Sequence, residues 1–95
     1  MAGPMSRTIA RRVVVRGHVQ GVFFRDSARR RALGRNVSGW IANRDDGAVE
    51  AWLEGEPDAV QSLIEFCRQG PRSAEVRSVD VSDEQPRGSE GFEVR

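Results

Sequence analysis

The 95-residue chain contains no lysine and no tyrosine, and it has a single cysteine and a single histidine. With Cys67 alone, no intramolecular disulfide can form and no paired-thiolate metal motif is available, so we expect a reduced, cytoplasmic protein. Long hydrophobic runs are also missing: the longest, such as residues 13–15, are too short for a membrane span or a signal-peptide core. The sequence therefore argues against a disulfide-stapled secreted domain and against a membrane protein.

The composition is that of one soluble globular domain. Hydrophobic residues make up 38% and charged residues 31%, which is typical of a folded chain rather than a disordered one. We expect residues 1–10, which lack apolar periodicity, to form a mobile tail, and residues 11–95 to form a single domain. The short length and the lack of a long apolar patch favour a monomer.

The small net charge of +1 hides two halves of opposite sign. Residues 1–47 contain ten arginines against three acidic residues, a net charge of +7, and residues 48–95 contain five against eleven, a net charge of −6. All fifteen basic residues are arginines. The near-neutral total argues against a strongly basic nucleic-acid-binding arm, but the positive half could still bind a smaller anion.

The first half of the chain predicts a strand followed by a helix. The three valines at 13–15 predict a strand over residues 11–16 that is buried on both faces, in the middle of a sheet. After a loop at 17–21, apolar residues recur every four positions from Phe24, which predicts an amphipathic helix. We expect Gly34 to end this helix in the left-handed conformation.

A hairpin and a second helix are predicted next. Alternating residues over 37–44 and 48–54, separated by an Asp-Asp-Gly turn, indicate two paired antiparallel strands. An apolar stripe then predicts a second helix. Pro57 suits the first turn of this helix, and Gly70 ends it.

The chain ends with two weaker strand patterns. Alternation at Val79 and Val81, with Val76 out of step, predicts a fourth strand, and residues 92–95 predict a short last one. The order β-α-β-β-α-β favours a ferredoxin-like α+β sandwich, with two helices on one face of a mainly antiparallel sheet of four to five strands.

One segment combines features that favour an anion. Residues 17–25 read Gly-His-Val-Gln-Gly-Val-Phe-Phe-Arg and contain no proline, so every residue keeps a backbone N–H donor. Gly17 and Gly21 can adopt positive φ, and the loop leads into a helix N-terminus. Arg25 adds a guanidinium group suited to two phosphate oxygens. A common glycine-containing turn with a solvated arginine is the alternative.

Residues 17–25 resemble the first signature of the acylphosphatase family. The segment 39–43, Gly-Trp-Ile-Ala-Asn, followed by Gly47, Val49 and Gly55, is similar to the second signature of that family. The resemblance extends from Val13 to the end of the chain. It implies a hydrolase that cleaves the carboxyl–phosphate bond of a small acyl phosphate, giving a carboxylate and phosphate, with no metal or other cofactor.

The resemblance also implies roles for particular residues. Arg25 would bind the phosphate and Asn43 would orient the attacking water, although an asparagine on a strand can also simply satisfy backbone groups. The phosphate-binding loop would consist of His18, Val19, Gln20, Gly21, Val22, Phe23 and Phe24, together with Arg25.

Other residues with reactive or aromatic side chains are expected to be structural. Cys67 lies on the apolar stripe of the second helix, which predicts packing, and His18 is expected near the mouth of the loop. Trp40 and Trp52 are expected to pack on the sheet, and residues 29–31 to form a solvated helix face that raises the local positive potential.

Two other functions fit the same fold. The first is a non-catalytic module that binds an anion or RNA, but RNA readers of this shape stack bases on sheet aromatics, and residues 11–16 include none. A pI near 8.0 is also below the usual basic footprint, so we expect no nucleic-acid partner. The second is an acyl-phosphate-binding domain of a larger carbamoyl-transfer protein, but this chain is too short to supply the remaining domains.

Overall fold

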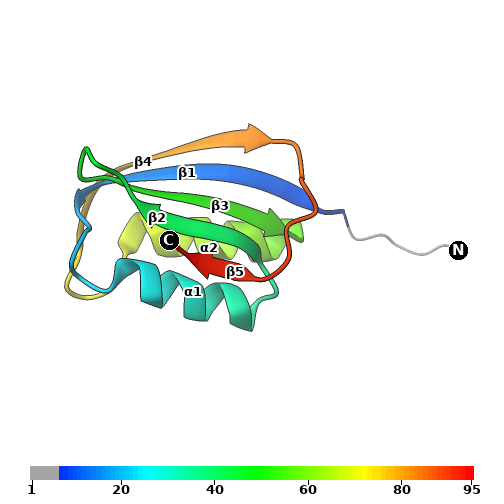
Figure 1. Ribbon diagram of the computed structural model, residues 1–95, viewed down its shortest axis with the longest axis horizontal. Coiled ribbons are helices and arrows are strands. Elements are labelled where there is room, and N and C mark those ends of the chain that lie inside the picture. Colours follow the sequence, from blue (N-terminus) through cyan, green and yellow to red (C-terminus); the bar gives the residue numbers. More distant parts are fainter. Residues whose placement is uncertain (1–6) are drawn as a thin grey trace, which may run out of the picture.

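The computed structural model describes residues 7–95 and contains two helices packed against a five-stranded sheet (Figure 1). The elements are β1 (Ile9–His18), α1 (Phe24–Gly34), β2 (Ser38–Asn43), β3 (Val49–Gly55), α2 (Pro57–Gln69), β4 (Glu75–Glu84) and β5 (Phe92–Val94). The strand order is β4-β1-β3-β2-β5, and every neighbouring pair is antiparallel except β2 and β5, which are parallel. In the part of the chain described, neither helix is long and apolar enough to cross a membrane.

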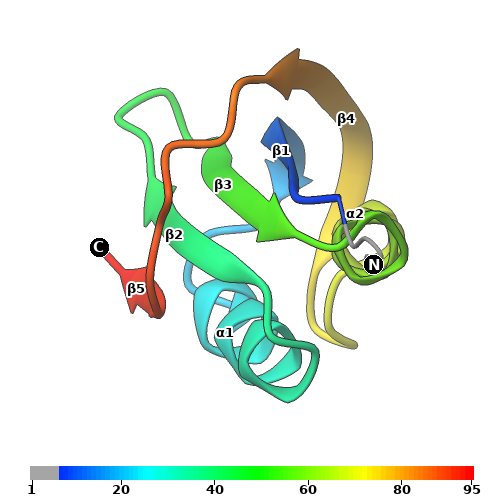
Figure 2. The ribbon, with the colours of Figure 1, turned by 90° about the vertical axis from the view of Figure 1, so that its right-hand side faces the viewer.

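Both helices cover the same face of the sheet (Figure 2). Helix α1 packs against β2 and β5, and α2 packs against β1, β3 and β4. The core lies between these two layers and includes the buried side chains of Val13, Phe24, Ile41, Leu53 and Leu63. The predicted ferredoxin-like α+β sandwich is therefore confirmed, with five strands in the sheet.

Strand β1 begins earlier than the sequence suggests. It starts at Ile9, which pairs with Gly55, and Ala10 is fully buried. Strand β1 thus includes two residues of the segment expected to be a mobile tail, because pairing with β3 continues to Ile9. Residues 1–6 of that predicted tail lie outside the described residues.

The prediction that β1 is buried on both faces is wrong. Val13 and Val15 are fully buried against the helices, whereas Arg12 and Val14 are half-buried and Arg16 is exposed on the other face. Strand β1 does pair on both sides, with β3 and β4. The valine run reflects β-propensity in a strand with two neighbours, and in this two-layer fold the helices cover only one face of that run.

Helix α1 ends differently from the prediction. Gly34 is its last residue and is not left-handed; the left-handed residue is Asn36, with φ 58°. The N–H of Val37 donates to Ala32 O (2.9 Å), and the N–H of Asn36 donates to Leu33 O (3.5 Å). This is the Schellman pattern, in which asparagine can replace the usual glycine because it tolerates the left-handed conformation.

A bulge explains why Val76 is out of step with the other valines of β4. Arg16 pairs with Ser78 but Gly17 pairs with Val76, so one residue of β4 is left without a partner. The extra residue restores Val76 to the face of Val79, and both pack against the core. Gly17 has φ 136°, and a Cβ there would lie 2.2 Å from a backbone oxygen of β4, so this bulge requires glycine.

On the face of the sheet opposite the helices, Glu54 binds the segment that connects β4 to β5. The residue is only 3% exposed, and its carboxylate accepts a hydrogen bond from Trp52 Nε1 (2.9 Å). It also accepts bonds of 2.7–3.2 Å from the backbone N–H groups of Arg87, Gly88 and Ser89 and from the Ser89 hydroxyl. These bonds hold the segment that leads to β5.

The hydrogen bonds to Glu54 make its charge stabilising. Burial alone raises the pKa of Glu54, but the bonds from Trp52, Arg87, Gly88 and Ser89 outweigh burial and lower the pKa from 4.5 to about 2. A lowered pKa in the folded state stabilises the fold above the unfolded-state pKa, and this stabilisation is lost as the pH falls toward 2. At neutral pH it corresponds to about 3 kcal/mol.

We expect Glu54→Gln to lower the free energy of unfolding by about 3 kcal/mol at pH 7, because an amide cannot accept these bonds as a carboxylate does. The difference from the unmodified chain should shrink as the pH falls from 4.5 to 2. Urea unfolding followed by circular dichroism over this range measures both effects. Glu90→Gln, an exposed carboxylate further along the same segment, is the matched control. A difference that stays constant down to pH 2 contradicts the assignment.

Candidate active site

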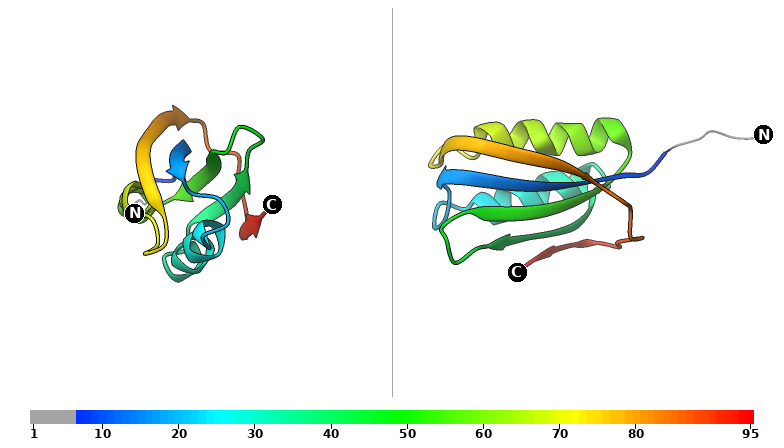
Figure 3. Two further views of the ribbon diagram at one scale, coloured as in Figure 1. Left: turned by 90° about the vertical axis from the view of Figure 1, so that its left-hand side faces the viewer. Right: turned by 90° about the horizontal axis from the view of Figure 1, so that it is seen from above.

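Strand pairing brings Asn43 to the end of the sheet where the β1–α1 loop begins. Asn43 pairs with Val49 on β3, and Val49 pairs with Val15 on β1. Residues directly opposite one another share a face of the sheet, so Asn43 lies in one row with buried Val15, on the face that carries the helices. The β1–α1 loop and the β2–β3 hairpin consequently lie at the same end of the molecule (Figure 3).

The β1–α1 loop contains two left-handed residues. Gly21 has φ 75° and Phe23, the residue before α1, has φ 64°. Gly21 adopts this conformation at no steric cost, but for Phe23 it costs roughly 1–2 kcal/mol. Left-handed residues alternating with ordinary ones turn successive backbone N–H groups into one concave surface. The strained Phe23 thus contributes to a backbone shape that can bind an anion.

The N–H groups of this loop are unused in the fold. Within residues 7–95, no backbone N–H of residues 19–25 donates a hydrogen bond to another protein atom. The first N–H groups of any helix lack partners, and here those of the loop add to them. Because the N-terminus of α1 also carries a partial positive charge, the combination favours a negatively charged ligand.

Two contacts with the core and one hydrogen bond hold the loop on its helix side. Val19 and Val22 are buried in the core, at 1% and 7% exposure. Ser73 Oγ, in the connection between α2 and β4, donates to Val22 O (2.9 Å). These contacts fix the loop while leaving its N–H groups unbonded.

The side chain of Gln20 ties the loop to the hairpin. Its Nε2 donates to Arg44 O (2.8 Å) and to Ala48 O (2.9 Å). Arg44 directly follows Asn43, so the bond reaches the residue next to the predicted water-orienting side chain. The sequence predicts Gln20 as part of the phosphate-binding loop but gives no sign that its side chain turns toward the hairpin.

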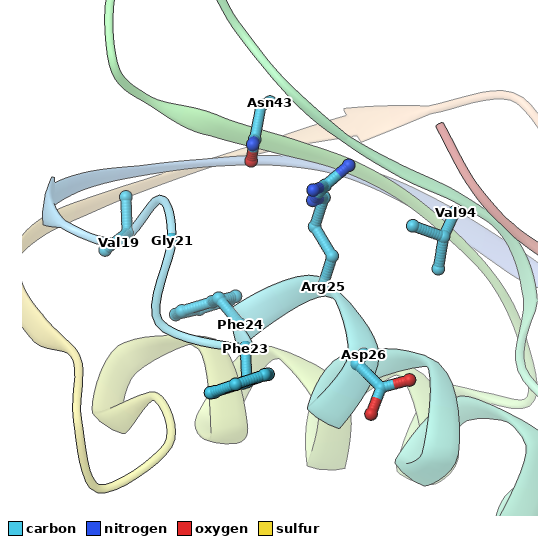
Figure 4. Close-up of a pocket in the computed structure, with 8 residues that line it drawn as sticks. All are labelled: Val19, Gly21, Phe23, Phe24, Arg25, Asp26, Asn43 and Val94. Carbon is cyan, nitrogen blue, oxygen red and sulfur yellow. The ribbon is translucent and has the colours of Figure 1, made fainter.

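Arg25 lies in the first turn of α1 and keeps its charge uncompensated by acidic side chains. Its Nη1 donates to the main-chain oxygen of Arg95 (2.6 Å), and in the described part of the chain it forms no ion pair with an Asp or Glu side chain. The neighbouring Asp26 pairs instead with Arg30 (2.9 Å). Figure 4 shows the Asp26 carboxylate extending away from the Arg25 guanidinium.

Arg25 and Asn43 meet at one cavity of about 290 Å³. In Figure 4 the Asn43 side chain extends from β2 and the Arg25 side chain from α1, into the space between sheet and helix. The residues that line the cavity are Val19, Gly21, Phe23, Phe24, Arg25, Asp26, Asn43 and Val94. The arrangement offers one cation, several backbone donors and one amide to a small anion and a water molecule.

Three of the predicted site residues do not line the cavity. His18 is exposed at the end of β1, Gln20 binds the hairpin, and Val22 is buried in the core. Two lining residues, Asp26 and Val94, were missed. Asp26 could have been found from its place beside Arg25, but Val94 reaches the site through the parallel pairing of β5 with β2, for which a three-residue strand carries no sequence signal.

Cys67 lies in the core and does not line the cavity. The side chain is 1% exposed within the core, and burial raises the pKa of the Cys67 thiol to about 12. It is therefore a packing residue, as predicted, since only the thiolate is a strong nucleophile. Among residues 7–95, no group of three or more His, Cys, Asp or Glu side chains is arranged to hold a metal ion.

Comparison with known proteins agrees with this geometry. A family profile described as acylphosphatase matches residues 11–94. The acylphosphatase of Rubrobacter xylanophilus is 54% identical over 85 residues, covering 88% of this chain and 77% of the relative. That of Haloquadratum walsbyi is 51% identical over 92 residues, covering 96% and 99% of the two chains.

The fold comparison gives the same answer. The crystal structure of acylphosphatase from Bacillus subtilis superposes with a TM-score of 0.88 at 35% sequence identity, covering 92% of this chain and 98% of that one. An acylphosphatase structure from Coxiella burnetii also has a TM-score of 0.88, at 36% identity over 93% of each chain. Sequence profile, close relatives and fold together show that the chain belongs to the acylphosphatase family.

Proposed function

We propose that this chain hydrolyses the carboxyl–phosphate bond of small acyl phosphates at the cavity between the β1–α1 loop and β2, without a metal. The observation that carries the proposal is the joint presence of Arg25, the unbonded N–H groups of residues 19–25 and Asn43 at that cavity. We further propose that the protein acts as a cytoplasmic monomer, in keeping with its single, buried and unpaired cysteine.

In this proposal the loop and Arg25 bind the phosphate group. The N–H groups of the loop and the first turn of α1 donate to its oxygens, and the planar Arg25 guanidinium can donate to two of them at once. Phosphoryl transfer spreads negative charge over the three equatorial oxygens, so fixed donors around them stabilise the transition state. Arg25 would exchange its bond to Arg95 O for bonds to the substrate.

Asn43 would orient the water that attacks phosphorus. Its side-chain amide can accept a hydrogen bond from water and also donate one, and the residue stands across the cavity from α1. The new P–O bond forms to the water oxygen while the P–O bond to the acyl group breaks, and its electron pair leaves on the carboxylate. A proton of the water passes to a phosphate oxygen of the substrate itself.

No strong base is needed for this step, because the carboxylate is a good leaving group and an acyl phosphate is a reactive anhydride. Positioning and charge stabilisation can then supply most of the rate enhancement. This reasoning fits a cavity whose only acidic lining residue, Asp26, is paired with Arg30.

The direct test is phosphate release from acetyl phosphate, measured with and without EDTA. We expect turnover that EDTA does not reduce, since the proposed donors all belong to the protein. Absence of turnover would favour a non-catalytic anion-binding module instead. Loss of activity in EDTA would overturn the metal-free mechanism.

We expect Arg25→Lys to lower kcat/KM for acetyl or benzoyl phosphate by about 100-fold, because an ammonium group cannot reproduce the planar two-oxygen contact. Steady-state kinetics with both substrates provide the measurement. Arg29→Lys is the matched control, since Arg29 is exposed one turn further along the same helix and away from the cavity. Near-normal hydrolysis by Arg25→Lys would remove Arg25 from the mechanism.

Asn43→Ala should lower kcat by at least about 100-fold and change KM little, by analogy with the loss of one transition-state hydrogen-bond donor. The same assay, run over a full range of substrate concentrations, separates the two constants. Asp45→Ala, an exposed change in the adjoining turn, should leave both constants unaltered. If only KM rises, Asn43 binds substrate rather than orienting water.

A further inference from the structure

We infer that the side chain of Gln20 is a positioning residue that sets the distance between the anion-binding loop and Asn43; the inference rests on the proposed function. Both N–H bonds of its amide are committed to the hairpin, to Arg44 O and Ala48 O. An amide nitrogen carries two hydrogens, so in this arrangement Nε2 has none left for a phosphate. The side chain thus influences the site through its bonds to the hairpin, and it does not itself line the cavity.

The hairpin does not need Gln20 to hold its own shape. The N–H of Arg44 donates to Ala48 O (2.8 Å), and the N–H of Gly47 donates to Arg44 O (3.2 Å). Within the hairpin, Asp46 Oδ2 contacts Arg44 (3.1 Å), and it also contacts Arg16 on β1 (3.2 Å). The hydrogen bond from the Ala48 N–H chiefly holds the pKa of Asp46 below its usual value, so this carboxylate stays ionised and keeps the turn closed.

The loop does not need Gln20 to hold its shape either. Val19 and Val22 anchor it in the core, and Ser73 bonds the carbonyl of Val22 from the opposite side. What Gln20 adds is a direct link between two parts that are each stable alone. Removing the link therefore frees the loop and the hairpin to shift relative to each other, rather than unfolding either one.

Such a shift matters because Gln20 connects the loop that would bind phosphate to the hairpin that follows the proposed water-orienting residue. Phosphate binding belongs to the loop and α1, whereas water orientation belongs to Asn43, one residue before Arg44. A misplacement of about 1 Å between reacting groups can cost about 100-fold in rate. Gln20 should therefore control kcat much more than affinity for phosphate.

The first experiment compares Gln20→Met with Ser73→Ala. Methionine keeps the length and packing of the side chain but donates no hydrogen bond, and Ser73→Ala removes the other side-chain hydrogen bond to the loop. We expect Gln20→Met to lower kcat for acetyl phosphate by about 10- to 100-fold and to leave the inhibition constant of inorganic phosphate within about threefold. A parallel loss of phosphate affinity would overturn the inference, since Gln20 would then shape the loop itself.

The second experiment is a double-mutant cycle with Asn43→Ala. If Gln20 acts through Asn43, Gln20→Met should lower kcat by less than about twofold further in the Asn43→Ala background. Ser73→Ala, which holds the far side of the loop, should have the same effect in both backgrounds. A full, independent loss from Gln20→Met in the Asn43→Ala background would contradict the inference.

A readout that needs no catalysis separates this inference from the proposed function. In ¹⁵N NMR spectra of the free protein, the side-chain amide signals of Asn43 should move in Gln20→Met and stay in place in Ser73→Ala. Unmoved Asn43 signals overturn the positioning role whatever the kinetics. If Asn43→Ala keeps its full kcat while these signals do move, the proposed water-orienting step fails and the positioning of Asn43 by Gln20 stands.

Discussion

The antiparallel pairing of β3 with both β1 and β2 is the constraint on which the site depends. It places Val15, Val49 and Asn43 in one row across three strands, and the alternation of strand side chains turns that row toward the helices. The β1–α1 loop must then pass beside the β2–β3 hairpin on its way to α1. A shift of one residue in either register would place Asn43 and Val15 on opposite faces of the sheet, so the ladder of β3 fixes the chemistry as well as the fold.

Two arginines of the positive half meet carboxylates of the negative half across the sheet. Arg11 on β1 pairs with Asp83 on β4 (3.1 Å), and Arg12 lies between Glu50 and Glu84. The hydrogen bond to Glu50 is the main reason that the pKa of Arg12 is raised. Arg25 lies on the helix side, away from these carboxylates. Arg11 and Arg12 are thus paired with carboxylates on neighbouring strands, whereas Arg25 has no Asp or Glu side-chain partner among the described residues.

Local patterns predicted most of the fold, and the misses share a physical cause. The hairpin and both helices follow from periodicity and turn residues, and the resemblance to acylphosphatases implied that Arg25 and Asn43 belong to one site. The features that the sequence did not reveal depend on contacts between distant segments. They are the bulge opposite Gly17, the hydrogen bonds between Glu54 and the β4–β5 connection, and the position of β5 beside β2. Spacing along one segment carries no information about such partners, so these features required the three-dimensional arrangement.

The local rules of protein structure are broken mainly where the site is. Within residues 7–95, every buried side-chain nitrogen and oxygen has a hydrogen-bond partner, yet the β1–α1 loop keeps unbonded backbone donors and an aromatic residue, Phe23, that is left-handed and 78% exposed. Arg25 adds a guanidinium group that has no Asp or Glu side-chain partner among these residues. Strain and unused polarity of this kind persist only where the surroundings hold them in place. Here the buried valines of the loop and the bond from Ser73 do so, and an anion bound in the loop would satisfy the unbonded donors and pair with Arg25.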